Sequence, residues 1–392
     1  MTPHPPCPDT RPRTLNPNPH DSAMSDPRLI YKIAFSSLKA LTLESARLIL
    51  DCVGSEERFF EMSEKMLRPI LGLNRRIYAD DVRRRALSEA EREIAFVTAN
   101  RIRTLYFTDP GYPRRLLECP DAPMMLYMLG QTDLNSARIL SIVGTRHATA
   151  YGTTFVSTLL SDLARKMADP LVVVSGLAYG IDVAAHRASL AEGVPTAGVL
   201  AHGLNTIYPA SHRDTAARMV REGGALLTDY RSIDATHRGN FLARNRIVAG
   251  LCDALLVAES DTRGGALVTA RLASAYSREV LALPGRISDR YSRGCNSLIA
   301  SDSAALVTSA DDLMKHMGWK PRPEEGSQTE LFTELSPEEE AITEVMRTTG
   351  EATLSQMLAS LDIPVHRLMS TLIDLEMRRV VLSLPGSNYR LL

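Results

Sequence analysis

From residue 138 onward the sequence alternates short apolar runs with longer segments of helical periodicity, and this alternation restricts the fold more than any other feature. The runs are rich in Val, Ile, Leu and Ala, and they lie at Ile139–Val143, Leu171–Ser175, Thr196–Leu200, Ala225–Asp229, Ala254–Glu259, Val280–Leu283 and Ala304–Val307. Helical patterns such as Thr153–Met167 and Gly264–Ser277 separate most of them. Strands that alternate with helices form parallel sheets with helices on both faces. We therefore predict an α/β fold with a doubly wound, Rossmann-like, mostly parallel sheet.

Two further runs ahead of this region extend the predicted sheet. Thr104–Phe107 and Met125–Leu129 have the composition of strands, and Asp109–Pro113 between them is rich in turn residues. We assign residues 102–318 to one extended Rossmann-like domain, which leaves room for smaller domains in a chain of 392 residues.

The chain ahead of residue 102 divides into three predicted segments. Residues 1–27 are rich in Pro, Asn and Thr and lack the apolar stretch of a secretory signal, so we expect a disordered leader. Residues 28–75 contain several short amphipathic helices, which favours a helical domain of the sterile-alpha-motif or helix-hairpin-helix type. Residues 76–101 are interpreted as a charged connecting helix.

The carboxyl-terminal part predicts a linker and a third small domain. Residues 319–334 contain Pro, Glu and Gly without periodicity and are interpreted as a linker. Residues 335–392 begin with Ser336-Pro337, an N-cap followed by a proline at the first helical position, and they end in an apolar alternation broken by turn residues. Three helices and a hairpin predict a winged-helix-like domain. Its eight acids against five Lys/Arg favour a protein-contact or regulatory role over DNA binding.

Charge and cysteine content exclude several classes of protein. The formal net charge is −1, so any nucleic-acid binding must come from a local basic patch. No apolar stretch approaches the roughly twenty residues that span a bilayer. The five cysteines contain no C-x-x-C pair, which fits free thiols in a reducing cytoplasm. We expect a cytoplasmic protein with no membrane span and no metal site.

Three loops that follow predicted strands have the chemistry of an anion site. Ligands of doubly wound sheets bind beyond the carboxyl ends of the strands, where helix N-termini present free N–H groups. Glycines let the backbone approach a phosphate, and arginine forks match its oxygens. The candidate binding residues in these loops are Gly144, Thr145, Arg146, Ser175, Gly176, Tyr179, Gly180, Arg263 and Gly264.

The segment Asn240–Arg246 adds an aromatic ring to this basic chemistry. Phe241 can stack on a nucleobase, while Arg244, Asn245 and Arg246 can contact the phosphate backbone. From residue 231 to residue 246 there are four arginines and one histidine against one acid. In isolation, the simpler interpretation is a solvated helix start whose arginines pair with nearby carboxylates.

Common enzyme motifs are missing from the chain. It has no G-x-x-x-x-G-K-[ST], no complete dinucleotide fingerprint, no G-x-S-x-G and no H-E-x-x-H. His186 and His202 are candidate bases, although a structural role is the better interpretation of His186. Asp182 is explained by the dipole of the helix that it begins, and Glu259 by holding Arg246 or Arg263 in place. We therefore expect no catalytic residue and no cofactor.

The motifs together resemble the DNA processing protein family DprA, also called Smf. The resemblance covers about residues 102–315, and its motifs occur in the expected order: Asp109–Pro113, Leu126-Tyr127, Ile142–Arg146, Ser175–Asp182 with Ala184–His186, Tyr208-Pro209, Phe241–Arg246 and Ser292–Asn296. Two positions depart from the family pattern. Tyr179 stands where the family often has a basic residue, and Ala201-His202 replaces the usual glycine start of the loop after the third core strand.

The resemblance implies a function without catalysis. Such proteins bind single-stranded DNA, load the RecA recombinase onto it during natural transformation, help displace single-strand binding protein and usually form homodimers. The resemblance implies that residues 102–318 are the DNA-binding domain. It implies a DNA pocket formed by Gly144, Thr145, Arg146, Ser175, Gly176, Gly180, Phe241, Arg244, Asn245 and Arg246. The hypothesis requires Arg146 and Phe241 to lie on the same side of the molecule.

One enzyme remains as an alternative from another class. A nucleotide-processing phosphoribohydrolase on a similar Rossmann-like sheet has a glycine loop to which Arg263–Leu267 bears a faint likeness. The acid expected a few residues beyond that loop is absent, since Val268 and Thr269 stand there. A purely structural adaptor is a third reading, and it would need no ligand at the sheet.

Overall fold

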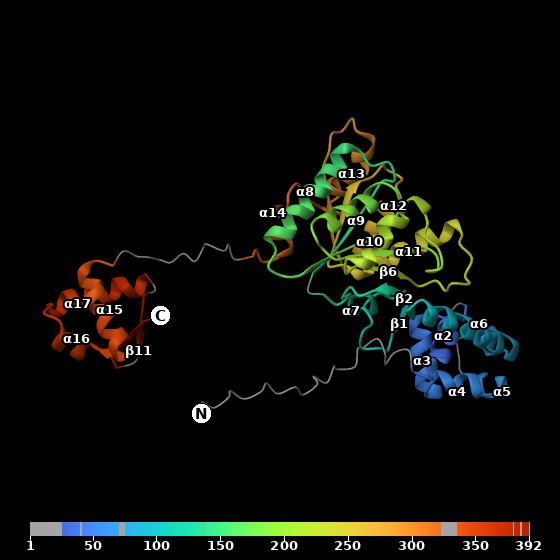
Figure 1. Cartoon of the computed structure of the whole chain (residues 1–392), viewed down its shortest axis with the longest axis horizontal. Helices are drawn as coiled ribbons and strands as arrows, with labels where there is room; N and C mark the ends of the chain where they lie inside the picture. Colours follow the sequence, from blue (N-terminus) through green and yellow to red (C-terminus); the bar gives the residue numbers. More distant parts are fainter. Residues whose placement is uncertain are drawn as a thin grey trace, which may run out of the picture. The chain divides into compact units, whose positions relative to one another are not determined.

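The computed structural model describes residues 26–39, 41–69, 75–136, 138–322, 335–378, 380–384 and 386–391 (Figure 1). These residues form two compact units that divide after Arg322. Residues 1–25 of the predicted leader and residues 323–334 of the predicted linker lie outside the described residues. No helix in the described ranges combines the length and the apolar character needed to cross a membrane.

A mixed sheet with nine strands forms the centre of the larger unit. In spatial order its strands are β1 (Arg103–Tyr106), β2 (Met125–Gly130), β6 (Ala225–Thr228), β5 (Thr196–Val199), β4 (Leu171–Ser175), β3 (Arg138–Gly144), β7 (Ala254–Glu259), β8 (Glu279–Ala282) and β9 (Ala305–Leu306). Strands β3 to β9 are parallel, whereas β1 and β2 pair antiparallel at one edge. The chain proceeds outward from β3 in one direction and then from β7 in the other. The predicted mostly parallel sheet is confirmed, and each predicted run is one of its strands.

Helices cover both faces of this sheet because its strands are apolar on both sides. One face packs α8 (Ala150–Lys166), α9 (Ile181–Ala191), α10 (Arg213–Arg221) and α14 (Ala310–Met317). The other face packs α11 (Arg238–Leu251), α12 (Gly265–Ala275) and α13 (Arg293–Ala300). Neighbouring residues of β3 enter different cores, since Leu140 packs with α8 and Ile139 belongs to the core of the opposite face. The alternation of side chains along a strand thus produces two cores.

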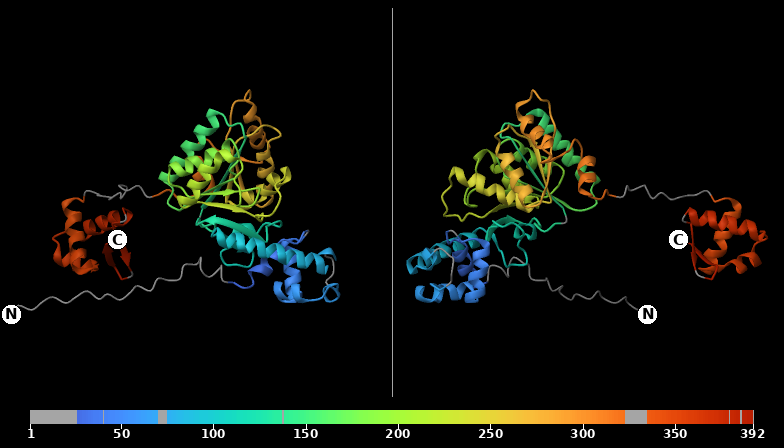
Figure 2. Two further views of the ribbon diagram at one scale, coloured as in Figure 1. Left: turned by 45° about the vertical axis from the view of Figure 1, so that its right-hand side comes forward. Right: turned by 180° about the vertical axis from the view of Figure 1, so that it is seen from behind.

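The amino-terminal helices pack beside the β1–β2 edge of the sheet, as both views in Figure 2 show. They are α2 (Leu29–Ser36), α3 (Leu43–Val53), α4 (Glu56–Glu61), α5 (Glu64–Leu67) and the long α6 (Asp80–Ala99), and a short α7 (Arg114–Leu117) follows β1. Lys32 of α2 pairs with Asp109 after β1 at 3.1 Å. The Glu93 carboxylate of α6 accepts hydrogen bonds from the Ser232 amide and hydroxyl. Polar contacts therefore tie these helices to the sheet.

The predicted linker begins too early. Trp319 is only 4% exposed and belongs to the core beneath α8 and α14. Beyond it, the Lys320 carbonyl accepts from the Ala168 amide at 3.1 Å, and the Arg322 amide donates to Lys166 at 2.5 Å. Residues 319–322 therefore belong to the sheet domain. Composition suggested a linker because one buried tryptophan and a backbone pairing leave no periodic pattern.

The smaller unit contains the three predicted helices and the predicted hairpin. Its elements are α15 (Pro337–Thr349), β10 (Ala352–Thr353), α16 (Leu354–Ser360), α17 (Val365–Met377), β11 (Val381–Leu384) and β12 (Asn388–Leu391). The strands form an antiparallel sheet in the order β10-β12-β11. Ser336 and Glu339 form a capping box at the start of α15, as the sequence pattern indicates. Leu368, Leu372 and Leu375 of α17 contribute to a separate core.

Candidate nucleic-acid interface

The loop after β3 needs glycine because two other elements press against it. A Cβ on Gly144 would lie 2.5 Å from the Ile181 side chain at the start of α9. The next residue is fixed from both sides, since the Thr145 amide donates to the Glu259 carbonyl at 2.7 Å and its carbonyl accepts from the Ile181 amide at 3.1 Å. This loop holds the exposed Arg146 at the carboxyl-terminal edge of the sheet, hereafter the rim.

The loop after β4 also depends on its glycines. Gly180 has φ +77°, and a Cβ there would overlap the carbonyl oxygen of Thr145. A Cβ on Gly176 would lie 2.5 Å from the Asp182 carboxylate and would also meet the Arg244 guanidinium. The two loops therefore pack against each other and against α11, which favours glycine at both positions.

Arg146 and Phe241 lie side by side at the rim, as the DNA-binding hypothesis requires. The Arg146 guanidinium carbon lies 5.7 Å from the centroid of the Phe241 ring. The exposed Tyr208 ring meets Phe241 edge to face, with 5.6 Å between centroids. Among the described residues no carboxylate pairs with Arg146, so its charge remains open to a ligand.

These side chains border a pocket of about 680 Å³ at the rim. Seven of the candidate residues line it, namely Gly144, Thr145, Arg146, Phe241, Arg244, Asn245 and Gly264. Tyr208, Arg238, Ser260 and Asp261 also line it and were not among the candidates. The exposed Arg238 falls within the basic stretch that the sequence showed, and Tyr208 within a quoted motif. Both could have been included on those grounds.

Arg244 is buried behind the pocket and holds its wall together. Its Nη1 donates to the Gly176 carbonyl at 2.6 Å and also to the Val199 carbonyl, while its Nε has no partner among the described residues. Burial lowers the pKa of Arg244, and the nearby Asp182 opposes this shift. Burial likewise raises the pKa of Asp182, against the favourable charge of Arg244. The guanidinium thus joins the β4 and β5 loops to α11.

The remaining candidates do not line the rim pocket. Arg246 pairs with Asp229 at 2.5 Å, which agrees with the interpretation of paired arginines. Ser175 is fully buried and donates to the Ile142 carbonyl at 2.5 Å. Tyr179 is exposed and lies edge to face with His212, at 5.0 Å between ring centroids. Arg263 is exposed, and Gly180 serves the turn described above.

Glu259 has a different role from the one expected. Its carboxylate accepts from the Thr149 amide at 2.9 Å and from the Thr149 hydroxyl at 2.5 Å, so it binds the start of α8. It holds neither Arg246 nor Arg263, because Arg246 is paired with Asp229 and Arg263 has no partner among the described residues. The expectation was wrong because the start of α8 lies beside the end of β7. The sequence alone does not show that these two segments are neighbours.

The two candidate histidine bases are both structural. His186 is fully buried on α9, with its Nδ1 2.7 Å from the Thr196 hydroxyl. His202 uses both ring nitrogens: Nδ1 lies 2.9 Å from the Gly203 carbonyl, and Nε2 accepts from the Tyr208 amide at 3.2 Å. The loop with Ala201-His202, whose role the sequence left open, thus positions Tyr208 beside Phe241.

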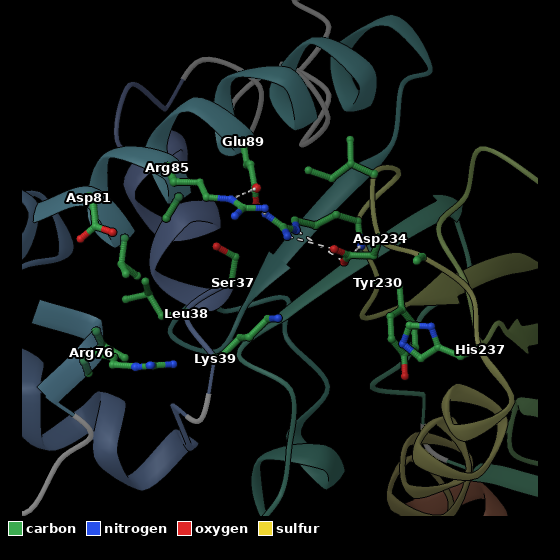
Figure 3. A pocket seen from close by; sticks show the side chains of 16 residues that line it. Ser37, Leu38, Lys39, Arg76, Asp81, Arg85, Glu89, Tyr230, Asp234 and His237 are labelled. Atoms are coloured by element: carbon green, nitrogen blue, oxygen red, sulfur yellow. Dashed lines mark hydrogen bonds and ion pairs between the residues drawn. The ribbon is translucent and has the colours of Figure 1, made fainter. Parts of the chain in front are cut away.

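A larger pocket of about 900 Å³ lies between the amino-terminal helices and residues 230–237 (Figure 3). Its charged side chains largely neutralise one another. Glu89 pairs with Arg85 at 2.8 Å and with Arg231 at 3.1 Å, and Arg231 also pairs with Asp234 at 2.9 Å (Figure 3). Because Arg85 and Arg231 are already paired with carboxylates, whereas Arg146 at the rim has no carboxylate partner among the described residues, this pocket is a weaker candidate for binding a polyanion than the rim pocket.

Relatives of known family match the sheet domain. The sequence profile of the family described as DNA recombination-mediator protein A matches residues 103–318. The DNA processing protein DprA of Streptococcus pneumoniae is 38% identical over 206 residues, which are 53% of this chain and 71% of that protein. The protein Smf of Synechocystis sp. is 36% identical over 228 residues, or 57% of this chain and 56% of that protein. The match therefore spans little more than half of the Synechocystis relative.

A solved structure agrees with these sequence matches. The X-ray structure of DprA from Streptococcus pneumoniae aligns with a TM-score of 0.60 at 31% identity, and the alignment covers 73% of this chain and 96% of that chain. The family profile itself spans more than half of this chain and includes the rim loops. The chain therefore belongs to the family of DNA recombination-mediator protein A.

Proposed function

We propose that this protein binds single-stranded DNA at the rim and acts as a recombination mediator, without catalysing a reaction. The observation that carries the proposal is the Arg146 guanidinium over the Phe241 ring, with no carboxylate partner among the described residues. A ring offers a stacking face to any base, and a guanidinium matches phosphate oxygens, so the pair suits an unpaired strand of any sequence. Membership of the recombination-mediator family supports the same role.

The chemistry of the pocket supports binding rather than catalysis. Its two lining carboxylates are both engaged, since Asp261 accepts from Arg290 at 2.6 Å and Asp182 accepts from the Ala178 amide at 3.4 Å beside the Arg244 charge. The alternative phosphoribohydrolase would need a free acid, and Glu259 is committed to Thr149. Turnover of a nucleoside monophosphate that disappears in Glu259→Gln with the fold intact would favour that enzyme.

The test is a binding titration with oligonucleotides at several salt concentrations. For single strands, the log–log salt slope is about −0.7 per phosphate contact, so Arg146→Ala should lower its magnitude by about 0.7 and weaken binding. Phe241→Ala should weaken binding by about 1–3 kcal/mol and leave the slope unchanged, because a stacked ring releases no counterions. Arg165→Ala, in the last turn of α8, is the matched control with wild-type behaviour. The proposal is refuted if the affinity for single-stranded oligonucleotides changes neither with the salt concentration nor with either rim substitution.

The family also suggests partners. We propose that the protein loads the RecA recombinase onto single-stranded DNA in the cytoplasm during transformation, helps displace single-strand binding protein, and forms a homodimer. Arg263, Tyr179 and Arg246, which lie outside the pocket lining, are proposed to contact the strand where it leaves the pocket. A mobility assay with and without a recombinase would test the loading step.

The smaller unit and the amino-terminal helices of the larger unit each have a proposed identity. The order helix, strand, two helices and hairpin in residues 337–391 fits a winged-helix-like domain, and α2 to α5 fit a domain of the sterile-alpha-motif or helix-hairpin-helix type. Helix α17 exposes an apolar stripe with a spacing of four residues, made of Val365, Met369, Ile373 and Met377. An apolar stripe suits a protein partner better than DNA, which supports the protein-contact or regulatory role.

A further inference from the structure

A second group of rings and guanidiniums lies beside the rim pocket. His147, which follows Arg146 in the chain, lies nearly parallel to Tyr291, with 6.3 Å between centroids and 22° between ring planes. The Arg290 guanidinium carbon lies 5.8 Å from the centroid of the same tyrosine ring. The arrangement repeats that of Arg146 and Phe241 with different residues.

This second group is joined directly to the pocket lining. The Tyr291 carbonyl accepts from the Ser260 amide at 2.6 Å, and Arg290 Nε donates to the Asp261 carboxylate at 2.6 Å. Ser260 and Asp261 both line the rim pocket. A strand leaving the pocket on this side therefore meets His147 and Tyr291 next.

The loop that carries Tyr291 has a rigid base. Asn296 of α13 holds Gly285 through two hydrogen bonds, at 3.1 Å from the Gly285 amide and at 2.9 Å to its carbonyl. The Tyr151 hydroxyl donates to the neighbouring Pro284 carbonyl at 2.6 Å. These contacts are made to the backbone of the loop, so the Tyr291 side chain is not needed to hold it in place.

The surroundings of the rings have the charge that a phosphate backbone needs. His147 is exposed, and Tyr291 is half-buried with its hydroxyl in no hydrogen bond among the described residues. Arg286 and Arg293, which precede and follow Tyr291, are exposed and have no carboxylate partner in the described part of the chain. Aromatic rings that reach solvent beside basic side chains are typical of single-strand binding surfaces.

We propose that His147, Tyr291 and Arg290 form a second base-stacking subsite, which takes the nucleotides adjacent to those bound at Phe241. This inference rests on the proposed function of the rim pocket and adds a neighbouring site to it. Short oligonucleotides occupy the pocket alone, whereas longer ones extend over the second subsite.

The test measures affinity against oligonucleotide length, from about 4 to about 20 nucleotides, for the full chain and its variants. Tyr291→Ala should weaken the binding of long oligonucleotides about 5- to 150-fold, the range expected for one lost stacking contact, and should leave the shortest unaffected. His147→Ala should act in the same direction. Tyr291→Phe is the matched control and should bind like the wild type, because it keeps the ring and loses only the hydroxyl. Thermal unfolding checks that each variant is folded.

A spectroscopic readout locates the contact. With 2-aminopurine placed at successive positions of a long oligonucleotide, stacking on a ring quenches its fluorescence. In the wild type two separate regions should be quenched, of which Tyr291→Ala abolishes one and Phe241→Ala the other. If the Tyr291→Ala variant binds oligonucleotides of every length as tightly as the wild type while Arg146→Ala still binds weakly, the second subsite is overturned. The proposed function of the rim pocket then still stands. A wild-type chain that binds no single strand at any length overturns both proposals.

Discussion

His186 is buried on α9 beside Thr196, the first residue of β5, and is held in one tautomer. The Thr196 hydroxyl donates to the Val173 carbonyl at 2.9 Å, so it must accept from Nδ1–H of His186. Nε2 is then unprotonated, buried and without a partner among the described residues. Burial, aided by the charge of Arg244 and by His212, lowers the pKa of His186 to about 3.

Because burial keeps His186 neutral, the stability of the sheet domain is sensitive to acid. The unfolded chain takes up a proton at His186 near pH 6.5 and the folded chain does not, so the contribution is intact above about pH 6.5 and is lost as the pH falls toward about 3. In His186→Asn, whose amide nitrogen replaces the Nδ1 donor, this loss should disappear. The difference in unfolding free energy between the two chains should change by up to about 1.4 kcal/mol per pH unit in that window. Urea unfolding from pH 7.5 to pH 4.5 measures it, and a pH-independent difference would contradict the lowered pKa of His186.

The arginines of α11 show which part of the candidate site the sequence could supply. Loop positions placed Arg146 at the predicted rim, and the family resemblance placed Phe241 in the same pocket; the structure brings the two side chains together. The sequence did not show that Arg244 is used internally, although a signal was present. Arg244 lies three and four residues before Ile247 and Val248, both buried, and therefore shares their face of the helix. Arg246 pairs with Asp229, which lies 17 residues earlier in the chain. Helical periodicity does not predict such a contact.

At the scale of elements, the start of α8 depends on a carboxylate from another strand. Glu259 at the end of β7 accepts from the amide and hydroxyl of Thr149, the N-cap of α8. Glu259→Gln removes one acceptor in a site only 2% exposed, so it should destabilise the sheet domain by about 1–3 kcal/mol. Urea unfolding measures this loss. Glu279→Gln, at the half-exposed contact between Glu279 and His316, is the matched control and should cost under about 0.5 kcal/mol. Equal effects at the two positions would contradict the role of Glu259.

The strands were predictable, but their spatial order and contacts were not. Apolar runs of strand length separated by helical patterns mark β3 to β9 by local chemistry alone. Nothing local shows that β7 lies beside β3, and this neighbourhood brings Glu259 to Thr149 and Asp261 to the pocket. The end of the sheet domain was misplaced for the same reason. Trp319 is held by packing with residues distant in sequence, including Arg138, whose guanidinium carbon lies 6.0 Å from the tryptophan ring centroid.

For the whole molecule, the boundary after Arg322 separates two units whose proposed functions can be tested apart. The unit before the boundary contains the rim pocket. The smaller unit after it has more acids than Lys/Arg, hence the acidic module, and exposes the apolar stripe on α17. If the acidic module contributes no phosphate contact, its removal leaves single-strand affinity and the salt slope unchanged.

Two truncated chains, one ending at Arg322 and one at Gly318, test both the boundary and this division of roles. The chain ending at Arg322 should unfold and bind single-stranded DNA like the sheet domain of the full chain, because it keeps residues 319–322. The chain ending at Gly318 lacks the buried Trp319 and should lose about 3–5 kcal/mol, as should Trp319→Ala in the full chain. Urea unfolding followed by oligonucleotide titration measures both quantities. Reduced affinity in a stable chain ending at Arg322 would show that the carboxyl-terminal module takes part in DNA binding, and a stable chain ending at Gly318 would return residues 319–322 to the linker.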